Sequence, residues 1–226
     1  RTDGWLEHVA GTGATGFSGD GGPATAANMN IRAIAAAPDG SVYVGSITRI
    51  RRVGLDGTIA TVLGNGTNSS TGNGGFAGNA TCRETLSMTF GSDGALYFVD
   101  FSPSTNIRRV DRGGRVTYFA GSDGSTTPTA NAVDARGWLL FGTVRIAASP
   151  DGGILVATQA PIVGFPQGRT SLIRKVTPEG RVVTIAGHDD VRNQALTGLG
   201  GPAERARIDA RSLAMASDGT VFIQEN

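Results

Sequence analysis

Short runs of apolar residues alternate with glycine-rich polar segments along the whole chain. In the first complete unit the apolar runs predict four strands, at residues 31–37, 41–45, 49–53 and 58–63. Glycine-containing segments separate these runs, and glycine adopts the positive φ that tight hairpin turns require. The first of the four strands, which contains Ile34, is apolar throughout, so we expect it to be packed on both faces.

This pattern recurs along the chain with a period of about 53 to 67 residues, which is the signature of a repeat architecture. One landmark is a pair of apolar residues followed by glycine, at Gly11, Gly64, Gly121 and Gly187. Another is a turn aspartate followed by glycine, at Asp39, Asp93, Asp151 and Asp218. A third is an Ile-Arg-Arg/Lys-Val segment, which begins at Ile50, Ile107 and Ile173.

Four strands per unit predict an all-β fold, a β-propeller of four-stranded blades. We expect a single propeller segment over residues 1–226, with units at approximately 12–64, 65–121, 122–187 and 188–226, the last of them incomplete. Residues 1–11, with a strand expected over Trp5–Ala10, are interpreted as the final strand of a preceding blade. The chain is therefore expected to be an incomplete arc of about four blades.

Composition narrows the fold class further. Glycine accounts for 35 of 226 residues and charged residues for only 17%, while hydrophobic residues reach 39%. These numbers disfavour a helical bundle, a coiled coil or a disordered chain. The net charge of +1 gives no overall field that would attract nucleic acid or an anionic membrane, and no apolar run is long enough to span a bilayer.

The long connection between units carries a family resemblance. Its fullest form reads GFSGDGGPAT from residue 16, and it is followed by APDG, VYV, RIRRV and DGTIATVLG. These segments resemble the NHL-repeat β-propellers over essentially the whole chain. The long connection resembles the propellers of teneurins and of bacterial Rhs/YD-repeat surface or toxin proteins. The chain departs from the family pattern where strand two ends, because the aspartate kept as Asp100 is replaced by Ser46 in the first unit and by Gln159 or a neighbouring residue in the third.

The resemblance implies a propeller and leaves function open, since propellers host enzymes and binding modules alike. The main hypothesis is a non-catalytic scaffold and recognition propeller of a large secreted or cell-surface protein, with a bacterial source favoured. Its partner would be a protein or the remaining domains of its parent chain, with carbohydrate as a further candidate and no cofactor, nucleic acid or membrane span. One alternative is a propeller enzyme of lyase or lactonase type with a channel metal in blades beyond this sequence. The other is a cytosolic NHL module that binds RNA or protein.

The residue types give little support to metal or nucleophilic chemistry. The histidines, His8 and His188, both flank the recurring glycine landmark, so we expect them to be structural or exposed. Asp20 is a candidate calcium ligand without the surrounding acidic residues that calcium requires, and a role as a turn residue that caps a helical turn at Pro23 is favoured. Cys82 has no histidine in its own unit to activate it, and is expected to be a small loop residue.

Charged residues repeat with the units, which favours structural roles for them. A catalytic aspartate would occur once, whereas the turn aspartates recur in every unit. The pairs Arg51-Arg52 and Arg108-Arg109 would suit an RNA-binding surface, but the low net charge and the lack of aromatic residues among them argue against it. One arginine of each pair is instead expected to lie over a blade face with its charged group in water.

The third unit departs most from the pattern, in the segment that follows its second strand. We expect a long loop at residues 160–170, stiffened by two prolines. Its apolar residues are not required by a blade core, and rigid apolar loops on a propeller commonly contact a partner. The residues predicted to bind are Ile162, Val163, Phe165 and Arg169.

Overall fold

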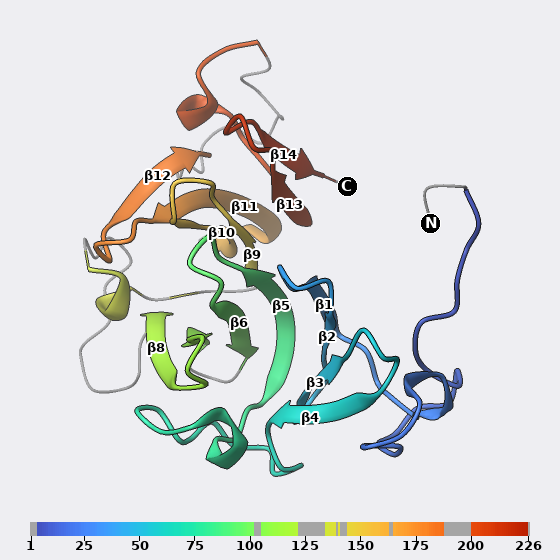
Figure 1. Cartoon of the computed structure of the whole chain (residues 1–226). Helices are drawn as coiled ribbons and strands as arrows, with labels where there is room; N and C mark the ends of the chain where they lie inside the picture. Colours follow the sequence, from blue (N-terminus) through green and yellow to red (C-terminus); the bar gives the residue numbers. More distant parts are fainter. Residues whose placement is uncertain are drawn as a thin grey trace.

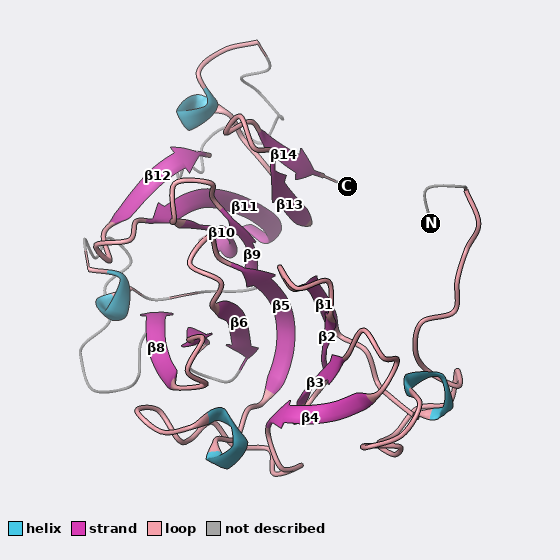
Figure 2. Cartoon of the chain, viewed as in Figure 1, coloured by secondary structure: helices cyan, strands magenta, loops and turns pink. Residues whose placement is uncertain are grey.

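The chain folds into antiparallel sheets with little helix, as seen in a computed structural model. The structure describes residues 4–101, 105–121, 134–138, 140, 144–162, 165–187 and 200–225. This part of the chain contains three four-stranded sheets and one two-stranded sheet. Its helix is confined to short 3-10 turns (Figure 2). The predicted all-β class is confirmed.

Each sheet consists of strands that are consecutive in the sequence, and forms one blade. Blade one contains β1 (Ala33–Ala36), β2 (Val42–Gly45), β3 (Ile50–Val53) and β4 (Ile59–Leu63). Blade two contains β5 (Glu84–Phe90), β6 (Leu96–Phe101), β7 (Asn106–Val110) and β8 (Val116–Gly121). Blade three contains β9 (Val144–Ala148), β10 (Ile154–Ile162), β11 (Phe165–Val176) and β12 (Val182–Ala186). Blade four contains β13 (Ser212–Met215) and β14 (Val221–Gln224).

The blades form an arc around a common centre. Their first strands are the inner ones, and β1, β5, β9 and β13 contact one another in that order (Figure 1). The short helical turns lie at the periphery, within the connections that lead from one blade to the next (Figure 2). They are η1 (Ala24–Ala26), η2 (Ala77–Asn79), η3 (Ala135–Gly137) and η4 (Ala203–Arg205). This arrangement is an incomplete β-propeller, as the repeat predicts.

At Gly64, Gly121 and Gly187 the glycine landmark lies where the chain leaves the outer strand of a blade. All four glycines have φ between 92° and 96°, a region that residues with a Cβ atom rarely adopt. At Gly64 the space is closed as well, because a Cβ atom would lie 2.2 Å from the carbonyl oxygen of Thr48. The backbone conformation favours glycine at all four positions, and the close approach requires it at Gly64, Gly121 and Gly187.

Apolar side chains from adjacent blades form the core. Ile50 of blade one packs in one cluster with Phe98 of blade two. Trp138, which is 1% exposed, packs among residues of blades two and three. Ile173 of blade three packs with Ile208, which precedes blade four. Full burial of such a side chain contributes about 1.5–3 kcal/mol, so contacts between blades are a main source of stability.

The expectation that the first strand is packed on both faces was wrong. Ala35 of β1 faces blade two and is buried, whereas Ile34 points to the opposite side and is 65% exposed. In a propeller each blade is packed between two others, and blade one is an end blade of the arc. Residues 5–9 form no strand in the structure, because a fourth strand needs a third strand to pair with. Their assignment to a preceding blade, like the other unit boundaries, stays a prediction.

The long segment of blade three is a hairpin rather than a loop. β10 and β11 continue to pair as far as Ile162 opposite Phe165, with Pro161 opposite Arg169. The expected loop at residues 160–170 was therefore wrong, since extended antiparallel pairing satisfies backbone groups that a long loop would leave unpaired. Val163 lies outside the described residues. Whether this hairpin contacts a partner stays a prediction.

Candidate functional site

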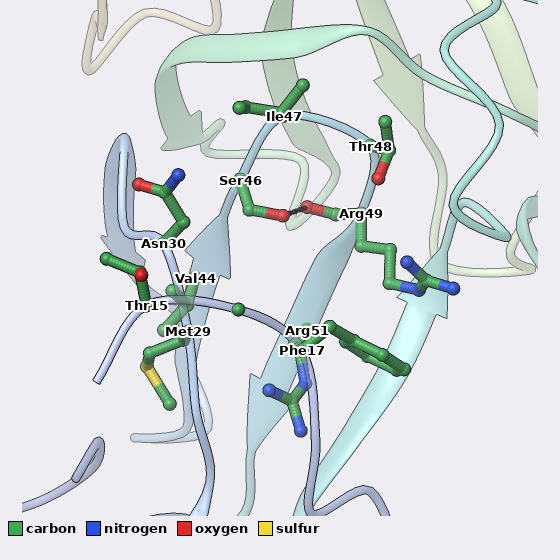
Figure 3. Close-up of a pocket in the computed structure, with 11 residues that line it drawn as sticks. Thr15, Phe17, Met29, Asn30, Val44, Ser46, Ile47, Thr48, Arg49 and Arg51 are labelled. Atoms are coloured by element: carbon green, nitrogen blue, oxygen red, sulfur yellow. Dashed lines mark hydrogen bonds between the residues drawn. The ribbon is translucent and has the colours of Figure 1, made fainter. Parts of the chain in front are cut away.

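A pocket opens at the end of blade one where two loops meet. Because the strands alternate in direction, the loop between β2 and β3 lies at the same end of the blade as the connection that leads into β1. The pocket has a volume of about 320 Å³, within the range of small-molecule sites. Its lining combines ring, amide, hydroxyl and guanidinium groups (Figure 3), chiefly those of Phe17, Asn30, Ser46, Thr48, Arg49 and Arg51.

Arg49 is stacked on an aromatic ring at one side of this pocket. Its guanidinium carbon lies 3.8 Å from the centre of the Phe17 ring (Figure 3), and its Nη2 donates a 2.7 Å hydrogen bond to the carbonyl oxygen of Asn65. It also lies against Gly66, where a Cβ atom would come within 2.7 Å of the guanidinium. Arg49 forms no ion pair with any other described residue. The stack and the hydrogen bond hold a positive charge in place beside the pocket.

Arg51 lies beneath the connection, with its side chain 3% exposed. Its guanidinium donates to the carbonyl oxygens of Ser18 and Asn28, at 2.7 and 3.2 Å, and its Nε donates to Asp20 at 2.8 Å. Asp20 also accepts from the amide and hydroxyl of Thr61. Burial raises the pKa of Asp20, but these hydrogen bonds outweigh it and lower the pKa overall. Asp20 does not cap η1, which has no side-chain cap; the expected cap was wrong.

Blade two contains a matching arginine, Arg108, whose side chain is 0% exposed. Its Nη1 donates to the carbonyl oxygen of Thr81 at 2.6 Å and to Asp100 at 3.1 Å, and its Nη2 donates to the carbonyl oxygen of Thr71 at 2.7 Å. Asp100 is also 0% exposed. The pair joins the second and third strands of the blade to its connection, and removing one partner of such a buried pair is costly.

Strand register relates the two blades residue by residue. In blade one Arg51 lies opposite Val44, and in blade two Arg108 lies opposite Phe98. Aligning the blades on these pairs places Ser46 at the position of Asp100 and Arg49 at the position of Asn106. Blade one thus has a hydroxyl where blade two has a carboxylate, and a guanidinium where blade two has an amide.

Sequence reasoning noted the departure at Ser46 but did not place Phe17, Asn30 or Arg49 in a site. Arg49 differs visibly from Asn106 in the aligned repeats, and that difference was the available signal. What the sequence did not show was that the connection folds back so that Phe17 contacts Arg49.

The turn aspartates lie in their turns, at the opposite end of the blades from the pocket. Asp39 accepts hydrogen bonds from the hydroxyl and amide of Ser41, which lower its pKa to about 2, and it pairs with Arg52. Blades two and three contain the same kind of pair, Asp93 with Arg109 and Asp151 with Lys175. Asp218 accepts from the amide of Thr220.

The other candidates from the sequence lie apart from the pocket. The ring of His8 lies 2.6 Å from the carbonyl oxygen of Gly11, and His188 lies outside the described residues. Cys82 is buried, which raises the pKa of its thiol to about 12 and keeps it protonated at neutral pH. Within the described ranges no three His, Cys, Asp or Glu side chains are grouped to hold a metal ion. The same part of the chain contains no helix of the length and apolarity that a membrane crossing needs.

Comparison with known proteins gives matches in structure only. No protein-family model matches the sequence, and no curated protein matches it. A Bacteroides thetaiotaomicron protein of unknown function is 16% identical, with a TM-score of 0.58 over 86% of this chain and 44% of its own. A gluconolactonase from Xanthomonas campestris is 12% identical, with a TM-score of 0.49 over 88% of this chain and 55% of its own. The PQQ-bound aldose sugar dehydrogenase of Streptomyces coelicolor is 18% identical, with a TM-score of 0.47 over 97% and 59%.

At these identities the likeness shows the propeller fold alone. The chain spans between 44% and 59% of the length of these three structures. The propeller part of the family resemblance is supported, whereas its teneurin or Rhs type is not. Two of the three proteins are named as enzymes, and likeness at this level assigns no activity to this chain.

Proposed function

We propose that this chain is the ligand-binding part of a propeller protein and that it binds a small polar molecule. The observation that carries the proposal is the pocket of blade one, where Phe17 and Arg49 stand beside the hydroxyl and amide groups of Ser46, Thr48 and Asn30. An aromatic ring supplies contact area, and a few fixed polar groups orient the ligand. The described lining contains no carboxylate or imidazole, so its chemistry is that of binding and orientation.

Replacing Phe17 by alanine is expected to weaken ligand binding about tenfold, since it removes the ring that forms one wall and holds Arg49. The probes are gluconate, glucose and sorbitol, and saturation-transfer NMR measures their binding to the 226-residue chain. We expect at least one probe to bind in a saturable way.

A matched control is Phe76→Ala in the connection of blade two. Phe76 is 56% exposed and has Arg115 over its ring, yet it does not line the pocket. This variant should bind like the unmodified chain. Failure of all three probes to bind, or equal binding by the Phe17 variant, would contradict the proposed function.

A propeller enzyme is the second candidate, as the alternative that the sequence offered. Solved propellers with this kind of fold include proteins named as gluconolactonases. For a lactonase, the chain with an added divalent cation should hydrolyse glucono-δ-lactone faster than the spontaneous reaction, which a pH-stat measures. An unchanged rate with calcium, zinc and manganese would remove this candidate for the chain as it stands.

The scaffold role in a secreted or cell-surface protein remains a prediction from the sequence. The same holds for contact with a partner through the hairpin of blade three, at Ile162, Val163, Phe165 and Arg169. Both predictions are compatible with ligand binding in the pocket, because the pocket lies in blade one and the hairpin lies in blade three.

A further inference from the structure

In blade two the protein binds a carboxylate of its own between the second strand and the connection. Both oxygens of Asp100 are used. Oδ1 accepts from the backbone N–H of Arg83 at 2.8 Å, and Oδ2 accepts from Arg108 at 3.1 Å and from the hydroxyl of Ser70 at 2.7 Å. Several donors around one carboxylate, one of them a guanidinium, make an effective anion site. In blade two the anion comes from the chain itself.

Blade one repeats the guanidinium of this site without the carboxylate. Arg51 occupies the position of Arg108, and each donates from Nη1 to a carbonyl oxygen of its connection, that of Asn28 in blade one and that of Thr81 in blade two. In blade two the same nitrogen has a second acceptor, Asp100. In blade one no second acceptor lies within hydrogen-bond distance among the described residues.

The backbone donor is repeated as well. Because Asn28 corresponds to Thr81, Asn30 corresponds to Arg83, whose N–H binds Asp100 in blade two. The N–H of Asn30 has no hydrogen-bond acceptor among the described residues. Asn30 lines the pocket together with Ser46, whose short side chain bonds to the carbonyl oxygen of Arg49 instead of reaching across (Figure 3).

The charges of blade one favour an anion at this place. Arg51 is balanced by Asp20, and the residue that fills the corresponding place beside Arg108 is the neutral Asn73. Each buried arginine thus has one carboxylate partner. Arg49 is additional, and it has no carboxylate partner among the described residues. Blade two also has a second arginine, Arg83 at the position of Asn30, but blade one is where a guanidinium without a carboxylate partner in the described part of the chain, that of Arg49, lines the pocket.

We propose that the pocket of blade one takes a small organic carboxylate, whose carboxyl group occupies the place that the Asp100 side chain fills in blade two. Arg51 and the N–H of Asn30 would bind its oxygens, and Arg49 would balance its charge. The hydroxyls of Ser46 and Thr48 suit a ligand with hydroxyl groups, so the class is a short hydroxy acid. This inference rests on the proposed function and names the class of molecule that the site binds.

Calorimetry with the 226-residue chain tests the proposal, with gluconate as the probe. Glucose is the uncharged comparison, and inorganic phosphate is the alternative anion. Gluconate should bind at least tenfold more tightly than either. Ser46→Asp gives blade one the carboxylate of blade two, and should reduce gluconate binding at least tenfold without lowering the melting temperature.

Two further variants test whether the loss of gluconate binding comes from the anion site itself or from any change to the pocket lining. Ser46→Ala leaves the space open but removes a hydroxyl, so it should weaken gluconate binding by less than Ser46→Asp does. Arg49→Gln removes the unbalanced charge and should weaken gluconate binding about tenfold, with a clearly smaller loss of glucose binding.

Each remaining outcome overturns a stated part of the account. Equal binding of gluconate and glucose, tighter binding of phosphate, or unchanged gluconate binding by Ser46→Asp overturns the carboxylate inference and leaves the proposed ligand-binding function intact. If gluconate, glucose and sorbitol all fail to bind, the proposed function itself is overturned.

Discussion

Replacing Asp100 by alanine is expected to destabilise the chain by about 3–5 kcal/mol, the cost of removing one partner of a buried ion pair. Arg108 would keep its charge inside blade two without a carboxylate, since both side chains are 0% exposed. The N–H of Arg83 and the hydroxyl of Ser70 would lose their acceptor too. Urea-induced unfolding, followed by the fluorescence of the buried Trp138, measures the loss.

The control is an ion pair at the surface. Glu84 lies 3.0 Å from Arg32, and their side chains are 29% and 44% exposed. Glu84→Ala should therefore cost about 1 kcal/mol or less. Similar losses in the two variants would show that Asp100 does not anchor the connection of blade two as described.

Gly64→Ala is expected to cost about 3 kcal/mol or more, through two effects that act together. The residue has φ of 92°, which costs a residue with a Cβ atom about 1–2 kcal/mol. The new Cβ would also lie 2.2 Å from the carbonyl oxygen of Thr48 and 3.0 Å from the Cα of Arg49. Both contacts are with backbone, so no side chain can move aside to relieve them. Urea unfolding measures this change as well.

Gly57→Ala separates strain from crowding. Gly57 has φ of 77°, and a Cβ atom there meets nothing within 4 Å. It should show only the conformational cost of about 1–2 kcal/mol. If the two variants lose equal stability, the close approach at Gly64 contributes nothing and the explanation of the landmark fails.

The fold could be predicted because its signals are local and repeated. Glycine and aspartate at a hairpin turn act within a few residues of each other, and they act again in each unit. The strands of blade one were predicted within one or two residues at most ends, as with β4 (Ile59–Leu63) against the expected 58–63. Errors arose where packing between blades determines whether a side chain is buried. Ile34 is an example, because its apolar side chain is exposed where blade one ends the arc.

The site could not be predicted because it depends on contacts between distant segments. The sequence shows two arginines side by side in the first two units, but not that Arg51 is buried beneath Ser18 while Arg52 pairs with a turn aspartate at the surface. The loss of an aspartate at Ser46 was visible. Its meaning required knowing that Arg51 and Asn30 converge on that position, which the repeat of the contacts in blade two shows.

A titration of the isotope-labelled chain with gluconate, followed by two-dimensional 1H–15N NMR, tests the central claim most directly. Blade two is the internal control, because its carboxylate site is already filled by Asp100. The account predicts saturable shifts of the backbone amides of Asn30 and Ser46 and of the Nε–H of Arg49, with the amide of Arg83 unchanged. An absence of saturable shifts in blade one, or equal shifts at Arg83, would contradict it.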